Sequence, residues 1–192
     1  MISISGSTVA IVGAGSATIT ATQTTDTNYL SGSSSTTITV AKAAATLSAM
    51  PSITKNFGDI AFTLVAPTSA ATGAVTFASN DTNVVAISGN TITIIGAGTA
   101  TVTATQATDA NYLEATTSFE LTVNKIAPSL GVMTAISKTF GDANFTITPP
   151  STNSSGGLTY TSSDTNVATI TGDVVTIVGA GTATIAVAQA TD

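Results

Sequence analysis

Apolar and polar residues alternate with a period of two along most of the chain, and turn-forming residues interrupt the alternation about every eight to twelve positions. This pattern is typical of β-strands with one buried face, and no segment carries convincing helical spacing. The stretch from residue 42 to residue 124 is predicted to contain seven strands, near residues 45–50, 60–66, 75–79, 84–88, 91–95, 99–105 and 118–123. Short strands separated by turns predict an all-β fold in which two sheets pack as a sandwich.

The alternation also assigns the expected core. The side chains predicted to face inward are Ile60, Phe62, Leu64, Val75, Phe77, Ile92, Ile94, Ala100, Val102, Ala104, Phe119, Leu121 and Val123. The threonines and serines between them are expected to face water. Gly89-Asn90 is predicted to form a hairpin turn, and Gly96-Ala-Gly98 a tight reversal.

The chain repeats itself at an interval of 83 residues. The landmarks that keep this interval are Gly13-Ala-Gly15, Gly96-Ala-Gly98 and Gly179-Ala-Gly181, then Gln23, Gln106 and Gln189, and then Asp26, Asp109 and Asp192. No gap is needed, and nearly half of the positions are identical between residues 42–109 and 125–192. Identity in register over such a length indicates tandem copies of one module.

The phase of the repeat predicts three parts. Residues 1–41 correspond to the C-terminal part of a repeat, residues 42–124 form a complete repeat, and residues 125–192 form a repeat that lacks its last strand. We expect an excerpt from a longer repetitive protein. The alternative is head-to-tail completion by strand donation, in which the positions equivalent to 84–109 are supplied twice. The short linker before Pro128 predicts a semi-rigid string of domains.

Composition excludes most kinds of catalytic and metal site. The chain has four lysines as its only basic residues, ten acidic residues and a net charge of -6, with no histidine, cysteine, arginine or tryptophan. Histidine bases, thiol nucleophiles, Cys/His zinc ligands and arginine clamps cannot be built from these residues. We therefore predict no enzyme activity, no catalytic residue, no cofactor and no metal ligand. Scattered lysines in an acidic chain argue against nucleic acid, and no membrane-inserting segment is predicted.

Acidic D-x-N steps are the only plausible ligand set. They are Asp26-Thr-Asn28, Asp81-Thr-Asn83, Asp109-Ala-Asn111 and Asp164-Thr-Asn166. A calcium ion takes about six to eight oxygen ligands, and no third acid follows at a suitable spacing. We therefore predict that these aspartates cap turns. A calcium ion between domains, with Asp59 or Asp142 contributing, stays open as the minority interpretation.

Three further motifs have a structural and a functional interpretation. Phe57-Gly-Asp59 and Phe140-Gly-Asp142 are each predicted to combine a buried aromatic anchor with a turn. Tyr29-Leu30 and Tyr112-Leu113 are expected to fill the core, with a sugar-stacking platform as the alternative. The alternating threonines at 18, 20 and 22 and at 99, 101, 103 and 105 are interpreted as strand formers on a solvated face, and ice binding is disfavoured. A Lys–Asn isopeptide crosslink is not predicted.

The second and third copies resemble a known family. Residues 83–105, and more closely residues 163–185, run through a turn, a short strand, a glycine, a second strand, Gly-Ala-Gly and a threonine-alternating strand. This order is similar to that of bacterial immunoglobulin-like domains of the intimin and invasin type (Big group 2). The resemblance covers every repeat. It implies tandem Ig-like β-sandwich domains that act as a stalk or spacer on cell surfaces, and the same module is found in phage structural proteins.

Together, the pattern and the resemblance predict a non-enzymatic structural spacer in a large repetitive, adhesin-like protein that is extracellular or on the cell surface. Its expected partners are neighbouring repeats, and a host-surface protein or a glycan is a further candidate. The alternative function is an Ig-like binding or decoration module of a phage virion, or a fibre-forming subunit completed by strand donation. In a binding module, loops such as residues 32–36 would contact the partner. No segment resembles the lectin-like tip of intimins, which puts direct receptor binding in doubt.

Overall fold

Sixteen β-strands and no helix make up the computed structural model, which describes residues Met1–Asp192. The all-β prediction is therefore confirmed. The chain divides into two compact units, Met1–Lys125 and Ile126–Asp192. Because residues 1–41 belong to the same unit as residues 42–124, the division into three repeats stays a prediction. No helix is present that is long and apolar enough to cross a membrane.

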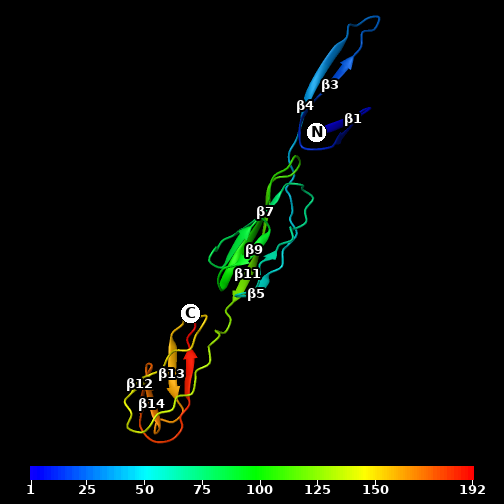
Figure 1. Ribbon diagram of the computed structural model, residues 1–192. Helices are drawn as coiled ribbons and strands as arrows, with labels where there is room; N and C mark the ends of the chain where they lie inside the picture. The colour runs from blue at the N-terminus through cyan, green and yellow to red at the C-terminus, as the bar shows by residue number, and fades with distance from the viewer. The chain divides into compact units, whose positions relative to one another are not determined.

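Residues 42–124 form a sandwich of seven strands in two sheets (Figure 1). The first sheet has the order β5–β11–β10–β7, with β5 at Ile53–Asn56, β11 at Ala115–Asn124, β10 at Gly98–Gln106 and β7 at Val75–Ser79. The second has the order β6–β9–β8, with β6 at Phe62–Thr63, β9 at Thr91–Ile94 and β8 at Val85–Ser88. Every pair is antiparallel except β11 and β5, which run parallel with Leu121 opposite Ile53.

The core lies between these two sheets. Its most deeply buried side chains are Ile92 and Val85 from one sheet and Leu121 and Val102 from the other. Contributions from both sheets to a single cluster are what a sandwich requires, because each sheet buries one face. Most of the predicted inward positions are buried or half-buried. Ile60 is the exception, since 87% of it is exposed.

Two of the predicted strands differ from the observed ones. Residues 45–50 form no strand, and the predicted strand at residues 60–66 shrinks to Phe62–Thr63. Ile60 therefore precedes the strand that was expected to turn it inward. The seventh strand is β5, which the alternation did not reveal, because β5 exists by pairing with the distant end of β11. A strand fixed by a nonlocal partner leaves only a weak local pattern.

The preceding segment of the first unit consists of two antiparallel hairpins. One joins β1 (Ile2–Ser5) to β2 (Thr8–Ile11), and the other joins β3 (Gly15–Gln23) to β4 (Gly32–Val40). The long β3–β4 hairpin is visible as the two paired blue strands in Figure 1. Moved by 83 residues, these four strands coincide with β8, β9, β10 and β11. Most of their side chains are exposed, because residues 1–41 include no counterpart of β5, β6 or β7.

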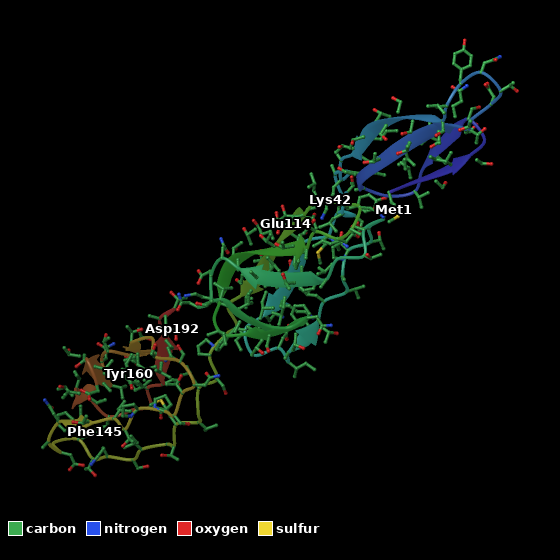
Figure 2. All side chains as sticks on the ribbon, turned by 90° about the horizontal axis from the view of Figure 1, so that it is seen from above. Met1, Lys42, Glu114, Phe145, Tyr160 and Asp192 are labelled. Carbon is green, nitrogen blue, oxygen red and sulfur yellow. The ribbon has the colours of Figure 1, made fainter.

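The second unit follows the same plan with fewer strands. Its strands are β12 (Phe145–Thr146), β13 (Leu158–Ser162), β14 (Ala168–Thr171), β15 (Val174–Ile177) and β16 (Ile185–Gln189). They form the sheets β12–β15–β14 and β13–β16, and each lies 83 residues after a strand or part of a strand of the first unit. Phe145 and Tyr160, labelled in Figure 2, are half-buried within this unit.

Candidate functional site

The loop between β10 and β11 is organised by the carboxylate of Asp109. Its Oδ1 accepts hydrogen bonds from the backbone amides of Asn111 and Tyr112, both at 2.8 Å. Its Oδ2 accepts hydrogen bonds from the backbone amide and the hydroxyl of Thr72, at 2.7 and 3.0 Å. A carboxylate that caps the amides two and three residues ahead forms an Asx-turn. Asp109 thus holds its own turn and ties it to the segment that contains Thr72.

These hydrogen bonds favour the charged form of the carboxylate. The amide of Thr72, followed by the amide of Asn111, holds the pKa of Asp109 far below its ordinary value of 3.8. Asp192 lies 83 residues later, and its Oδ2 accepts hydrogen bonds from the amide and hydroxyl of Ser155 and from the hydroxyl of Ser154. The amide of Ser155 contributes most to lowering the pKa of Asp192. Ser155 is the repeat equivalent of Thr72, so the same device occurs twice.

The chain is fastened to this loop where the complete repeat begins. Ala43 forms a parallel β-bridge with Tyr112. The amide of Ala43 donates to the carbonyl of Asn111, and the carbonyl of Ala43 accepts from the amide of Leu113, both at 2.8 Å. The Nζ of Lys42 donates to Thr108 Oγ1 at 3.0 Å and to the carbonyl of Asp109 at 2.5 Å. Lys42 and Glu114 accordingly lie at the same end of the repeat in Figure 2.

Gln106 supports the loop from inside. Only 3% of this residue is exposed, and its Nε2 donates to the carbonyls of Ala71 and Gly73 at 3.0 and 3.1 Å. In the second unit, Gln189 Nε2 donates to the carbonyls of Ser154 and Gly156 at 3.0 and 2.8 Å. Sequence reasoning used these glutamines only as landmarks of the repeat. A buried amide side chain that recurs at a strand end is the signal that would have revealed their role.

The other D-x-N steps also cap turns. Asp26 Oδ1 accepts from the amides of Asn28 and Tyr29 at 2.8 Å, and Asp81 and Asp164 each accept from the amide two residues ahead at 2.9 Å. These hydrogen bonds confirm the turn-capping prediction. No group of three or more acidic residues is placed so that it could hold a metal ion.

The Phe-Gly-Asp elements correct one prediction. The turn itself is present, because Asp59 Oδ2 accepts from the amide of Asn56 at 2.9 Å and Asp142 Oδ2 accepts from that of Thr139 at 3.0 Å. The aromatic ring, however, is not a buried anchor, since 46% of Phe57 and 69% of Phe140 are exposed. The turn directs this ring outward, and Phe62 and Phe145 face the interior instead.

The tyrosine and leucine pairs also differ from the prediction. In the first segment, Tyr29 and Leu30 are exposed, because residues 1–41 lack the strands that would cover them. In the complete repeat Tyr112 is half-buried, but Leu113 is still exposed, so the pair does not fill the core.

Residues 32–36, expected to form a loop, belong to strand β4. The hollow beside them is shallow and lined by Ala21, Thr22, Gln23, Gly32, Ser33 and Ser34. These side chains are small and uncharged. Hydroxyl pairs cross the same hairpin, with Ser16 Oγ and Thr39 Oγ1 3.1 Å apart and Thr20 Oγ1 and Ser35 Oγ 2.8 Å apart. Cross-strand hydroxyl pairs support the interpretation of these threonines as strand formers on a solvated face.

No protein-family model and no curated protein sequence matches the chain. Among solved structures, the chain is similar to a SusE-like surface-located polysaccharide-binding protein from the heparin utilisation locus of Bacteroides thetaiotaomicron. The two are 12% identical, with a TM-score of 0.32, over 85% of this chain and 32% of the other. The chain thus spans about a third of that protein, and a likeness of this size carries no inference about activity.

Proposed function

We propose that this chain is a non-enzymatic spacer segment of a large repetitive, adhesin-like protein on a cell surface, built from domains of the bacterial immunoglobulin-like kind. The observation that supports this proposal best is the fastening of Lys42 and Ala43 to the loop that follows β10. A linker that is hydrogen-bonded into the next repeat has little freedom to bend. Such a connection suits a protein whose purpose is to hold its ends apart.

The chemistry of the surface agrees with this purpose. Hydroxyl side chains and small apolar residues dominate, and the polar network around Asp109 is spent on joining segments of the chain. A spacer needs stable, repeated connections and no reactive groups. The same network supplies the connections in both repeats that contain an equivalent of β10 and the segment at residues 71–73.

Copy number provides the experiment. Chains with one, two, three and four copies of residues 42–124 are expected to grow in end-to-end length by a constant increment of about 30 to 40 Å per copy, measured by small-angle X-ray scattering. Growth with the square root of copy number is the behaviour of a flexible string and would contradict a rigid spacer. Antibodies against residues 42–124 are expected to label intact cells of the source organism. Labelling only after lysis would contradict the location.

A second candidate function is the binding of a glycan through Tyr29 and Leu30. The observation that favours it is exposure, since 69% of Tyr29 and 87% of Leu30 are accessible. An exposed aromatic ring beside an apolar side chain suits stacking against a sugar. Retention of the chain on immobilised polysaccharides, lost in Tyr29→Ala and kept in Tyr112→Ala, is the expected result. Equal retention of both variants and the parent chain would exclude this site.

A further inference from the structure

The side chain of Asn111 reaches out of its own repeat. Asn111 Oδ1 accepts a hydrogen bond from the backbone amide of Ala14 at 2.9 Å, across 97 positions of sequence. Both backbone groups of Asn111 are already engaged, the amide by Asp109 Oδ1 and the carbonyl by the amide of Ala43. The backbone of Asn111 is therefore held from two sides, and its side-chain oxygen is presented to the preceding segment of the chain.

Gly13 makes room for this oxygen. A Cβ atom at position 13 would lie 2.7 Å from Asn111 Oδ1, closer than non-bonded atoms approach. The preceding segment thus offers a donor, the amide of Ala14, beside a position without a side chain. Glycine followed by alanine is the beginning of the Gly-Ala-Gly motif that recurs every 83 residues.

The two halves of this contact lie at opposite ends of one repeat. In the complete repeat, Gly98 pairs with Val123 at one end of the β10–β11 hairpin, and Gln106 pairs with Ala115 at the other. The Gly96-Ala97 turn directly precedes Gly98, whereas Asn111 lies in the loop after Gln106. Each full repeat therefore carries a donor turn at one end and an acceptor asparagine at the other. Complementary patches at opposite ends of a module generate head-to-tail arrays.

We propose that Asn111 and the Gly13-Ala14 turn form a repeat-to-repeat joint, in which the asparagine of one repeat caps the glycine-alanine turn of the repeat before it. The partner that fits this surface is a neighbouring copy of the same module. The joint sets the orientation of one repeat on the next. Its biological purpose rests on the proposed spacer function, but the contact is tested independently of it.

Hydrogen exchange of the Ala14 amide, followed by NMR in the complete chain, tests the joint. The Asn111→Ala variant is expected to accelerate exchange of this amide about fivefold, the factor supplied by one hydrogen bond of ordinary strength. Asn111→Asp keeps an acceptor oxygen and is expected to keep the protection. Asn28 is the matched control, because it occupies the equivalent loop and no residue of the chain bonds its side chain. Asn28→Ala is expected to leave Ala14 unchanged.

Protection of the β10 and β11 amides in the same spectra shows that each variant remains folded. Unchanged exchange at Ala14 in folded Asn111→Ala, or equal acceleration in Asn28→Ala, would overturn the joint. Neither outcome touches the copy-number experiment, so failure of the joint and failure of the spacer function are distinguishable.

Gly13→Ala examines the contact from the other side. The new methyl group is expected to displace the Asn111 side chain and to accelerate exchange at Ala14 to the level of Asn111→Ala. The double variant is then expected to be no faster than either single variant, since both remove the same bond. Gly32→Ala is the control, because a Cβ there meets nothing within 4 Å. Additive effects in the double variant would show that Gly13 and Asn111 act separately and would contradict the joint.

Discussion

At the scale of single residues, one carboxylate does the work of several contacts. Asp109 caps the amides of its own turn and binds Thr72 from a different segment. Its pKa lies below the ordinary value because these donors stabilise the charge. A group with a lowered folded pKa stabilises the fold above its unfolded pKa. That contribution is lost as the pH falls from the unfolded value toward the folded one.

Asp109→Asn is therefore expected to lower the urea midpoint of the first unit at neutral pH. The difference from the parent chain should be constant above about pH 5 and should shrink as the pH falls below about 4, where the unfolded carboxyl binds a proton. Denaturation curves between pH 7 and pH 2.5 measure it. Asp26→Asn is the matched control, because Asp26 caps a turn without a partner like Thr72. A difference that does not depend on pH would contradict the assignment.

The three repeat-equivalent glutamines form a natural series. Gln106 is buried, Gln189 is half-buried and Gln23 is exposed. Replacing Gln106 by alanine leaves the carbonyls of Ala71 and Gly73 without their donor, which is expected to cost about 1 to 3 kcal/mol. The expected loss is smaller for Gln189→Ala and close to zero for Gln23→Ala. Chemical denaturation of the three variants gives the order, and an equal loss at all three positions would contradict it.

At the scale of elements, the last strand of the complete repeat is shared by two neighbours. β11 pairs antiparallel with β10 and parallel with β5. In the second unit the counterpart of β10, which is β16, has β13 as its one neighbour, and residues 136–139, the counterpart of β5, form no strand. Val102 and Ala104 are fully buried, whereas their equivalents Ile185 and Val187 are only half-buried. The strand thus determines both the burial of its neighbour and the existence of β5.

Adding the sequence of residues 110–124 after Asp192 is expected to supply this strand. The amides of β16 and of residues 136–139 should then become protected from hydrogen exchange, because both gain a pairing partner. A control extension carries threonine in place of the residues equivalent to Phe119, Leu121 and Val123, and it should protect neither segment. Protection by both extensions, or by neither, would contradict the assignment of residues 125–192 as a repeat without its last strand.

How far the sequence predicts an element depends on where its partner lies. β7, β8, β9 and β10 are close to the predicted ranges, because local alternation and adjacent turns define them. β5 and the contact of Ala43 with Tyr112 depend on residues far along the chain. Among the candidate site residues, the aspartate turns followed from the D-x-N spacing. The partners Thr72, Lys42 and Gln106 had no such local signature.

At the scale of the whole molecule, composition narrows the chemistry more sharply than the fold does. A chain without histidine or cysteine has no thiol to oxidise and no nitrogen ligand of the kind that transition metals prefer. Unfolding is therefore expected to be insensitive to reducing agents.

Calcium is the remaining case. Each D-x-N carboxylate is occupied by backbone amides, so we expect the thermal midpoint to be the same in millimolar calcium and in a chelator. Calorimetry in the two buffers measures it. A midpoint that rises with calcium would replace the turn-capping interpretation with the interdomain ion, and substitution of Asp59 or Asp142 would then identify the ligand.

The parallel pairing of β5 with β11 has a mechanical consequence. Pulling on the two ends of the complete repeat tends to slide these parallel strands along each other, so the hydrogen bonds between Ile53–Asn56 and Leu121–Asn124 share the load. An antiparallel hairpin pulled from its open end gives way one bond at a time. A tether under flow would gain resistance to stretching from this arrangement without any added covalent crosslink.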